Sequence, residues 1–215
     1  MSNNQLITTI TEAVIRQLAN SQENRKIPVG VSNRHVHLGR EDVKRLFGID
    51  AGLTKCKELS QPGQFACEET VTLVGSRGVI ENVRVLGPTR NKTQVEISAG
   101  DGIKLGVQAP IRDSGDLTSS ASITLVGSVG SITLGEGTII AARHIHMHTR
   151  DAREWGLNDK ERVSVKVPGV RGLVFNEVLV RVSNDYKLEM HIDIDEANAT
   201  LLGNNSYVKI ITGEK

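Results

Sequence analysis

The sequence predicts a mostly β protein that contains two copies of one β unit, with short helical segments and an N-terminal amphipathic helix. Three observations lead to this fold class. The chain has one Trp, two Tyr and three Phe but 21 Gly, a composition that favours short β-branched strands joined by glycine turns. From Glu69 onward, short β-type runs alternate with Gly, Pro, Asn and Asp, as in barrels or sandwiches. A histidine-containing segment also occurs twice.

The N-terminal region is predicted to be a helix over residues 5–19, followed by a polar linker over 20–26. The helix is expected because apolar residues recur at helical spacing, at Leu6, Ile7, Ile10, Ala13, Val14 and Leu18. The linker has no periodic apolar signal. A strand then begins at Ile27, continues at the same period through His35 and His37, and is followed by a short helix over 40–48 that ends at a glycine.

The remainder of the chain is predicted to form roughly a dozen strands. The expected β runs are 69–87, 93–98, 102–110, 122–134, 137–148, 161–170, 173–183, 187–195 and 206–212. Residues 151–156 and 196–203 are expected to be short helical segments. The stretches LVGSRG (73–78) and LVGSVG (125–130) lack the Lys-Ser/Thr of a phosphate-binding P-loop and are interpreted as hairpin turns.

Charge and hydropathy exclude several classes of partner. Lys+Arg 26 against Asp+Glu 25 gives a net charge of +1, so neither nucleic-acid nor membrane-surface binding is expected. No apolar run reaches the ~18–20 residues of a membrane span, and no secretion signal is visible, so a soluble intracellular protein is expected. The two cysteines, Cys56 and Cys67, are too few for a disulfide framework.

The two halves of the chain share a pattern. Residues 34–46 (RHVHLGREDVKRL) align without gaps with residues 143–155 (RHIHMHTRDAREW). A second alignment, of residues 81–98 with 176–193, sets Glu96 opposite His191. The sequence therefore predicts a duplicated unit, although convergence of strand patterns is the alternative for part of the similarity.

Five of the six histidines and one glutamate form two candidate metal sites. Residues i and i+2 of a strand share a face, so His35 with His37, and His144 with His146, can each present two imidazoles together. Zinc commonly adds a carboxylate or a third histidine and keeps one position open for catalysis. We therefore expect one site of His35, His37 and Glu96 and another of His144, His146 and His191. The alternative is that each pair is a surface or capping pair. His148 is left out because its counterpart is Gly39.

Arg90 is the candidate anion-binding residue, because it precedes Glu96 by six residues and a planar guanidinium beside a metal suits bidentate capture of phosphate or carboxylate. The alternative is a solvated turn residue after Pro88. Cys67 is a second-rank nucleophile and more simply a small buried apolar residue. Glu68 and Glu69 are second-rank metal ligands, of which one at most can face a given site.

Segments over nearly the whole chain from Ile27 to Thr212 resemble the PduL-type phosphotransacylases, also called phosphate propanoyltransferases. They are VGVSNRHVHL, QPGQFACEETVTLVG, LGPTRNKTQVEIS and ARHIHMH, with the later His191. The resemblance implies two β-barrels with short helices, two zinc ions per chain, and interconversion of propanoyl-CoA or another short acyl-CoA plus phosphate with acyl phosphate plus CoA. It implies a first barrel of residues 27–34 plus 142–213, a second of 35–141, and an N-terminal targeting helix and linker over 1–26.

The resemblance also implies site residues and partners. Arg90 resembles the phosphate-binding catalytic arginine, and the predicted coenzyme A contacts are Ser32, Asn33, Lys57, Arg84 and Asn198. The helix resembles the peptides that direct such enzymes into the lumen of bacterial microcompartments, so shell or cargo partners and a homo-oligomer, a dimer or larger, are expected. Two rival interpretations remain: a dizinc hydrolase that uses water as acyl acceptor, and a non-catalytic barrel whose metals are fully enclosed by protein ligands.

Overall fold

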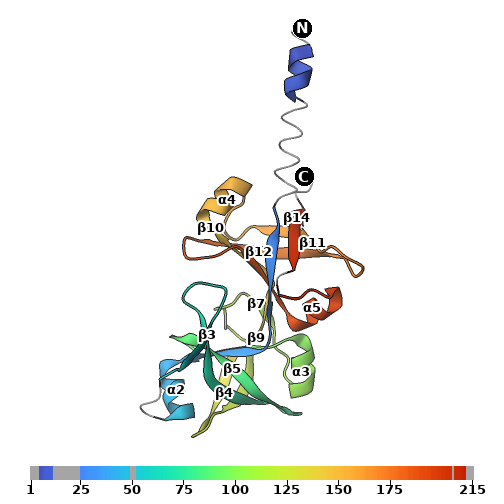
Figure 1. Cartoon of the computed structure of the whole chain (residues 1–215). Coiled ribbons are helices and arrows are strands. Elements are labelled where there is room, and N and C mark those ends of the chain that lie inside the picture. The colour runs from blue at the N-terminus through green and yellow to red at the C-terminus, as the bar shows by residue number, and fades with distance from the viewer. Residues whose placement is uncertain (1–4, 12–24, 49–51, 205, 212–215) are drawn as a thin grey trace.

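The computed structural model describes residues 5–11, 25–48, 52–204 and 206–211. Two bodies of strands are stacked one above the other (Figure 1), each with its own buried apolar cluster. Residues 5–11 are helical, and the side chains of Leu6, Ile7 and Ile10 are exposed. The rest of the predicted helix, 12–19, and linker residues 20–24 lie outside the described residues. None of the helices in the described ranges is long and apolar enough to cross a bilayer.

The first barrel is a closed sheet whose strands come from both ends of the described chain. In order around the barrel they are β1 (Ile27–Ser32), β13 (Glu189–Asp193), β10 (His144–His148), β12 (Val174–Ser183), β11 (Arg162–Lys166) and β14 (Tyr207–Ile211). Strand β1 closes the barrel by pairing parallel to β13 and antiparallel to β14. A strand from the start of the chain is therefore held between two strands near its end.

The second barrel is closed by the strands between β1 and β10. Its ring consists of β4 (Phe65–Val74), β5 (Val79–Arg90), β2 (His35–Gly39), β6 (Gln94–Glu96), β9 (Ser131–Ala141) and β8 (Ala121–Val126), which returns to β4. Two short strands, β3 (Lys55–Glu58) and β7 (Ile111–Arg112), add to β4 and β9. The prediction of a mostly β fold with two similar barrels is confirmed.

The barrels repeat one unit in detail. His35 lies opposite Glu96 in an antiparallel pair, as His144 lies opposite His191. The two positions that the alignment of residues 81–98 with 176–193 sets together, Asn82 and Glu177, both have a positive φ, of 56° and 58°. Non-glycine residues rarely adopt this conformation, so its recurrence at matched positions supports duplication over convergence.

Each ligand-bearing strand leads into a short helix. Helix α2 (Arg40–Phe47) follows β2, α4 (Thr149–Trp155) follows β10, and α5 (Ile194–Thr200) follows β13. The expected β run 102–110 is wrong in its first part, because α3 (Ala99–Leu105) occupies it. A capping box of Ser98 and Asp101 starts this helix, and such local caps outweigh a weak strand pattern. Strand β3 was missed because its side chains are exposed and give no apolar alternation.

The two glycine-rich stretches are hairpin loops, as predicted. Gly75 donates to the carbonyl of Gly78, and Gly127 donates to that of Gly130. A Cβ on Gly75 would lie 2.1 Å from the carbonyl oxygen of Leu105 at the end of α3, and one on Gly127 would lie 2.4 Å from that of Leu46 in α2. The glycines therefore let a helix end pack directly against each hairpin.

Candidate active site

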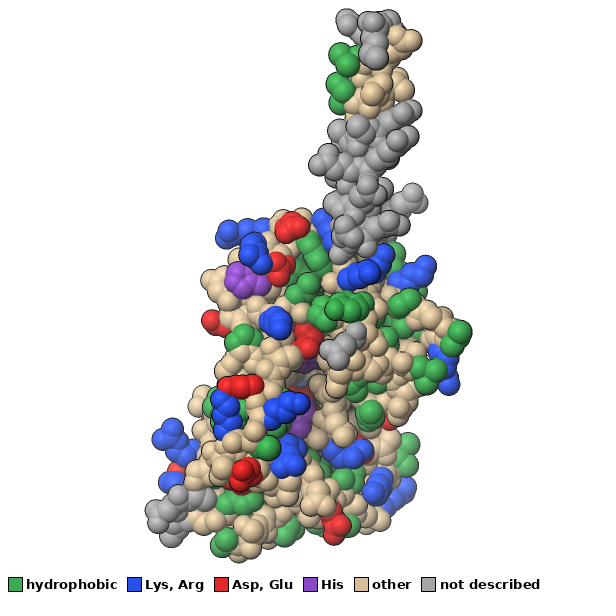
Figure 2. Space-filling model, in the orientation of Figure 1, with side chains coloured by type: hydrophobic (Ala, Val, Ile, Leu, Met, Phe, Trp, Pro, Cys, Tyr) green, Lys and Arg blue, Asp and Glu red, His purple; other side chains and the backbone are tan. Residues whose placement is uncertain are grey.

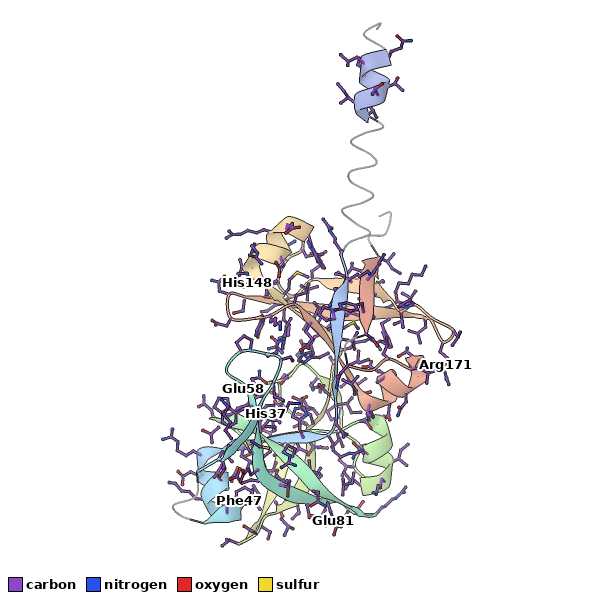
Figure 3. All side chains as sticks on the ribbon, viewed as in Figure 1. His37, Phe47, Glu58, Glu81, His148 and Arg171 are labelled. Carbon is purple, nitrogen blue, oxygen red and sulfur yellow. The ribbon has the colours of Figure 1, made fainter. Side chains whose placement is uncertain are left out.

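A cleft of about 740 Å³ separates the two barrels and is lined by residues of both. Figure 2 shows histidine side chains at the bottom of the hollow between the two bodies. The labelled His37 in Figure 3 lies on the side of the second barrel that faces the first, whereas His148 lies at the outer surface. The candidate ligands of both clusters line this one cleft.

The cluster of the second barrel brings together His35, His37 and Glu96, whose candidate ligand atoms lie within 4.8 Å of one another. The Nδ1 of His35 donates to the carbonyl of Asn33 at 2.8 Å, and its Nε2 lies 3.4 Å from a Glu96 oxygen. Such a backbone hydrogen bond fixes the tautomer and orientation that a metal-binding imidazole requires.

The cluster of the first barrel brings together His144, His146 and His191 within the same limit of 4.8 Å. The Nδ1 of His144 donates to the carbonyl of Ala142 at 2.8 Å, so the backbone orients it as it orients His35. The carboxylate of Glu189 accepts a hydrogen bond from Nε2 of His191 at 2.6 Å. The two clusters thus have related construction but different donor sets, three nitrogens against two nitrogens and a carboxylate.

Three of these imidazoles suit a metal ion because burial keeps them neutral. Burial is the largest cause that lowers the pKa of His37 to about 3, of His144 to about 4 and of His146 to about 2, with neighbouring cationic side chains adding to it. Nδ1 of His37 and both ring nitrogens of His146 are buried without a hydrogen-bond partner among the described residues. Unpaired buried nitrogens are costly, and coordination would satisfy one nitrogen of each ring.

The carboxylate of Glu96 is held in its charged form. Burial alone raises its pKa, but the charge and hydrogen bond of His35, followed by the charges of His37 and Arg90, lower the pKa well below the usual range. On the other side of this pair, burial lowers the pKa of His35 and the interaction with Glu96 more than offsets it, so the net shift is upward.

Arg90 ends β5 and lies half-buried at this cluster. One terminal nitrogen lies 2.8 Å from His37 Nε2 and donates to it, and the other donates to Ser114 Oγ at 3.4 Å. Burial lowers its pKa, and the charge of Arg181 lowers it further while Glu96 opposes the shift. Arg90 is therefore not a solvated turn residue, and its guanidinium is directed at the candidate ligands of the second barrel.

Sequence comparisons identify the family. The phosphate propanoyltransferase family model matches residues 28–203. This chain belongs to the phosphate propanoyltransferase family. It is 55% identical over 186 residues to a phosphate propanoyltransferase of Thermotoga maritima, covering 86% of this chain and 89% of that one. It is 50% identical over 206 residues to one of Clostridioides difficile, covering 96% and 97%, and 50% identical over 214 residues to one of Lachnoclostridium phytofermentans, covering 98% and 100%. The resemblance to this acyltransferase family is confirmed.

Four of the five predicted coenzyme A residues line the cleft of this phosphate propanoyltransferase family member. Ser32, Asn33, Lys57 and Arg84 do so, whereas Asn198 is exposed on α5 and is absent from the lining. Arg84 donates to the backbone carbonyls of Cys67 and Glu68, each at 2.9 Å. Its guanidinium therefore also braces β4 against β5.

The second-rank residues lie outside both clusters. Cys67 is fully buried in the second barrel's core, and burial raises the pKa of its thiol to about 11, so it is an apolar packing residue. Glu69 accepts from the backbone N–H of Thr54 at 3.0 Å, and Glu68 is exposed. His148 caps α4 by accepting from the N–H of Arg150.

Sequence reasoning missed several residues that support the ligands. Gln94 donates to Glu96 Oε1 at 2.5 Å and to Ser114 at 2.8 Å, and Ser114 donates to Glu96 at 3.0 Å. Strand alternation could have identified Gln94 and Glu189. Each precedes a predicted ligand by two residues and therefore lies on the same face of its strand. Ser114, Gln61, Arg181 and Tyr186 carry no such signal, because folding alone brings their segments to the cleft.

Proposed function

We propose that the chain interconverts propanoyl-CoA, or another short acyl-CoA, and phosphate with the acyl phosphate and CoA. In the forward direction a phosphate oxygen attacks the thioester carbonyl, the C–S bond breaks, and the proton of hydrogen phosphate ends on the thiol of CoA. The observation that supports this most directly is a single cleft that holds two metal-ligand clusters and a half-buried arginine, contributed by both barrels.

The residues have distinct roles in this proposal. His35, His37 and Glu96 would hold one zinc ion, and His144, His146 and His191 a second. Zinc there would polarise the thioester carbonyl and favour the thiolate form of CoA. Arg90 binds and orients phosphate, with Ser114 holding one of its terminal nitrogens. Lys57 and Arg84 offer positive charge to the phosphates of coenzyme A at the cleft wall, with Ser32 and Asn33 beside them and Asn198 as an outer contact.

Three further parts complete the proposal. We infer that residues 1–26 form a targeting segment that directs the enzyme to a microcompartment lumen, since Leu6, Ile7 and Ile10 expose an apolar stripe. We also propose that the chain divides into one barrel domain of residues 27–34 plus 142–213 and another of residues 35–141. We propose in addition that the protein forms a homo-oligomer.

The test is release of CoA from propanoyl-CoA by the metal-loaded full chain, with and without phosphate. Phosphate-dependent release with stoichiometric propanoyl phosphate is the expected result. Release that is independent of phosphate and yields propanoate would identify a thioester hydrolase instead. Substituting Arg171, which lies at the outer edge of the first barrel (Figure 3), provides a control that removes a charge without touching the cleft.

A further inference from the structure

A second arginine reaches the cleft from the barrel opposite to that of Arg90. Arg181 lies on β12, directly opposite His146 in the parallel pair of β10 and β12, and it lines the cleft. Its guanidinium donates to the hydroxyl of Tyr186 at 3.3 Å and lies 5.8 Å from the centre of that ring. Tyr186 in turn stacks on His146 at 4.3 Å between ring centres. Arg181 is thus oriented beside the histidine cluster of the first barrel.

Arg181 has no carboxylate partner among the described residues, and neither has Arg90. By contrast, Arg34, Arg143 and Arg162 each pair with an acidic side chain. Arg90 and Arg181 line the same cleft, Arg90 from the second barrel and Arg181 from the first. Two like charges that face one cleft repel each other, and an anion between them relieves the repulsion.

The internal symmetry of the fold shows that a barrel of this kind does not need the positive charge of Arg181. The position equivalent to Arg181 in the second barrel, opposite His37 in the parallel pair of β2 and β5, is Leu86. Conversely, Arg84 lies opposite His35, where the first barrel has Leu179 opposite His144. Leucine fills the same strand position in a barrel of the same construction. The arginine at position 181 therefore has a role other than stabilising the barrel.

We propose that Arg181 is a phosphate-binding residue that, with Arg90, clamps the phosphoryl group of phosphate and of acyl phosphate from opposite barrels. This inference rests on the proposed function. A phosphate dianion offers enough oxygens for two planar guanidiniums, each making paired charge-assisted hydrogen bonds. Tyr186 positions the clamp by holding a terminal nitrogen of Arg181.

The test compares Arg181→Leu with Arg171→Leu, which removes the same charge from the outer edge of the same barrel (Figure 3). Both variants are studied as metal-loaded full chains, with metal content measured first. The Kd for inorganic phosphate is measured by calorimetry, and the KM values for phosphate and for propanoyl-CoA are measured by steady-state kinetics. Arg181→Leu is expected to raise the phosphate Kd and KM roughly 10- to 100-fold, the range for lost charge-assisted hydrogen bonds, with metal content and the KM for propanoyl-CoA unchanged.

Arg181→Lys and Tyr186→Phe sharpen the result. Lysine keeps the charge but not the planar fork, so its phosphate Kd is expected to lie between those of the wild type and the leucine variant. Phenylalanine is expected to weaken phosphate binding by a smaller factor than leucine at position 181. An unchanged phosphate Kd in Arg181→Leu, or a loss of metal in that variant, would overturn the clamp. Phosphate-independent CoA release by the wild type would overturn the proposed function instead, and the phosphate Kd values would still decide the role of Arg181.

Discussion

The buried imidazoles are the residues whose ionisation the fold controls most strongly. His37, His144 and His146 remain neutral in the folded chain far below pH 6.5, with pKa values of about 3, 4 and 2. A neutral nitrogen is the form that binds metal. The fold thus keeps these candidate ligands neutral without a metal, and this neutrality is expected to affect stability.

The metal-free chain is predicted to lose stability as the pH falls below 6.5. In the unfolded chain these histidines bind protons near the ordinary histidine pKa of 6.5, whereas in the folded chain they stay neutral down to about pH 4. The stabilising contribution is therefore complete above pH 6.5. It declines below that by up to ~1.4 kcal/mol per pH unit for each histidine that charges on unfolding.

Urea denaturation of the chelator-treated chain between about pH 7 and 5.5 measures this slope. His146→Asn is expected to make it shallower. His35 contributes the opposite slope, and only above pH 6.5, because its pKa is raised in the folded state. A free energy of unfolding that does not change over this range would contradict the assignment of neutral buried imidazoles.

Arg90→Ala is predicted to lower kcat/KM for the phosphate-dependent reaction while leaving metal content and fold intact. The guanidinium touches the His37 ring but is not itself a ligand. Loss of ~2–4 kcal/mol of transition-state stabilisation corresponds to roughly 30- to 1,000-fold. Arg90→Lys should also be poor, since a point charge cannot reproduce the planar fork. Steady-state kinetics measures the loss of kcat/KM, and metal analysis measures the metal content. Near wild-type turnover in the alanine variant would show that Arg90 has no part in the mechanism.

At the scale of elements, each ligand-bearing pair of strands is anchored by one arginine and one capped helix. Arg34, just before β2, pairs with Asp101 of α3 at 2.8 Å, and Arg143, just before β10, pairs with Glu196 of α5 at 2.7 Å. Both acids are also the third helical residue of a capping box. In both barrels, therefore, an ion pair between an arginine and a capping-box acid holds the start of the strand with two histidines against the helix that follows the third candidate ligand.

Asp101→Ala is predicted to reduce the free energy of unfolding by about 2–4 kcal/mol. The substitution removes the Asp101 half of the capping box and a part-buried charge-assisted hydrogen bond to Arg34 together. Glu41→Ala, which breaks the exposed pair with Lys44, is the control and should have little effect. Chemical denaturation of both variants measures the difference. Equal stabilities would mean that the capping box does not anchor the strand.

The N-terminal segment is an element whose role deletion can separate from the catalytic body. Removing residues 1–20 is predicted to leave the melting temperature and turnover almost unchanged and to reduce self-association and co-localisation with a microcompartment shell. The apolar side chains of Leu6, Ile7 and Ile10 are exposed, so they are available to a partner groove. A truncated enzyme that unfolds or loses turnover would show instead that the helix packs on the barrels.

At the scale of the whole molecule, the cleft exists only because two barrels face each other. Glu189 of the first barrel accepts hydrogen bonds from Ser60 and Gln61 in the loop between β3 and β4 of the second, and Gly100 of the second donates to Asp195 of the first at 2.7 Å. These contacts hold the two ligand clusters on opposite walls. Neither barrel alone provides the complete set of groups.

Two zinc ions per chain are predicted for protein purified without added metal. His37→Ala should lower the content to one by disrupting the cluster of the second barrel, and His146→Ala should do the same through the first. Elemental analysis measures both, with His148→Ala, which alters only the cap of α4, as the control. Active protein with almost no metal would contradict the assignment of both clusters as metal sites. One zinc in the wild type would mean that only one cluster is a metal site.

The sequence alone was sufficient for features that repeat locally. Strand alternation placed His35 with His37 and His144 with His146 on shared faces, and the alignment of the halves matched Glu96 with His191. The order of the β runs and the hairpin turns followed from Gly and β-branched residues. Such features depend on neighbours within a few residues, so a linear pattern contains them.

Tertiary structure decided what depends on segments that are distant in the chain. The end of α3, in a segment where a strand had been expected, packs on the Gly75 hairpin. Arg181, Tyr186 and Ser114 reach the cleft through strand pairing and loop packing that no local period encodes. The sequence by itself therefore predicted the two sets of candidate ligands that the fold brings together, whereas only folding decided which charged groups face them, since barrel closure and docking set those distances.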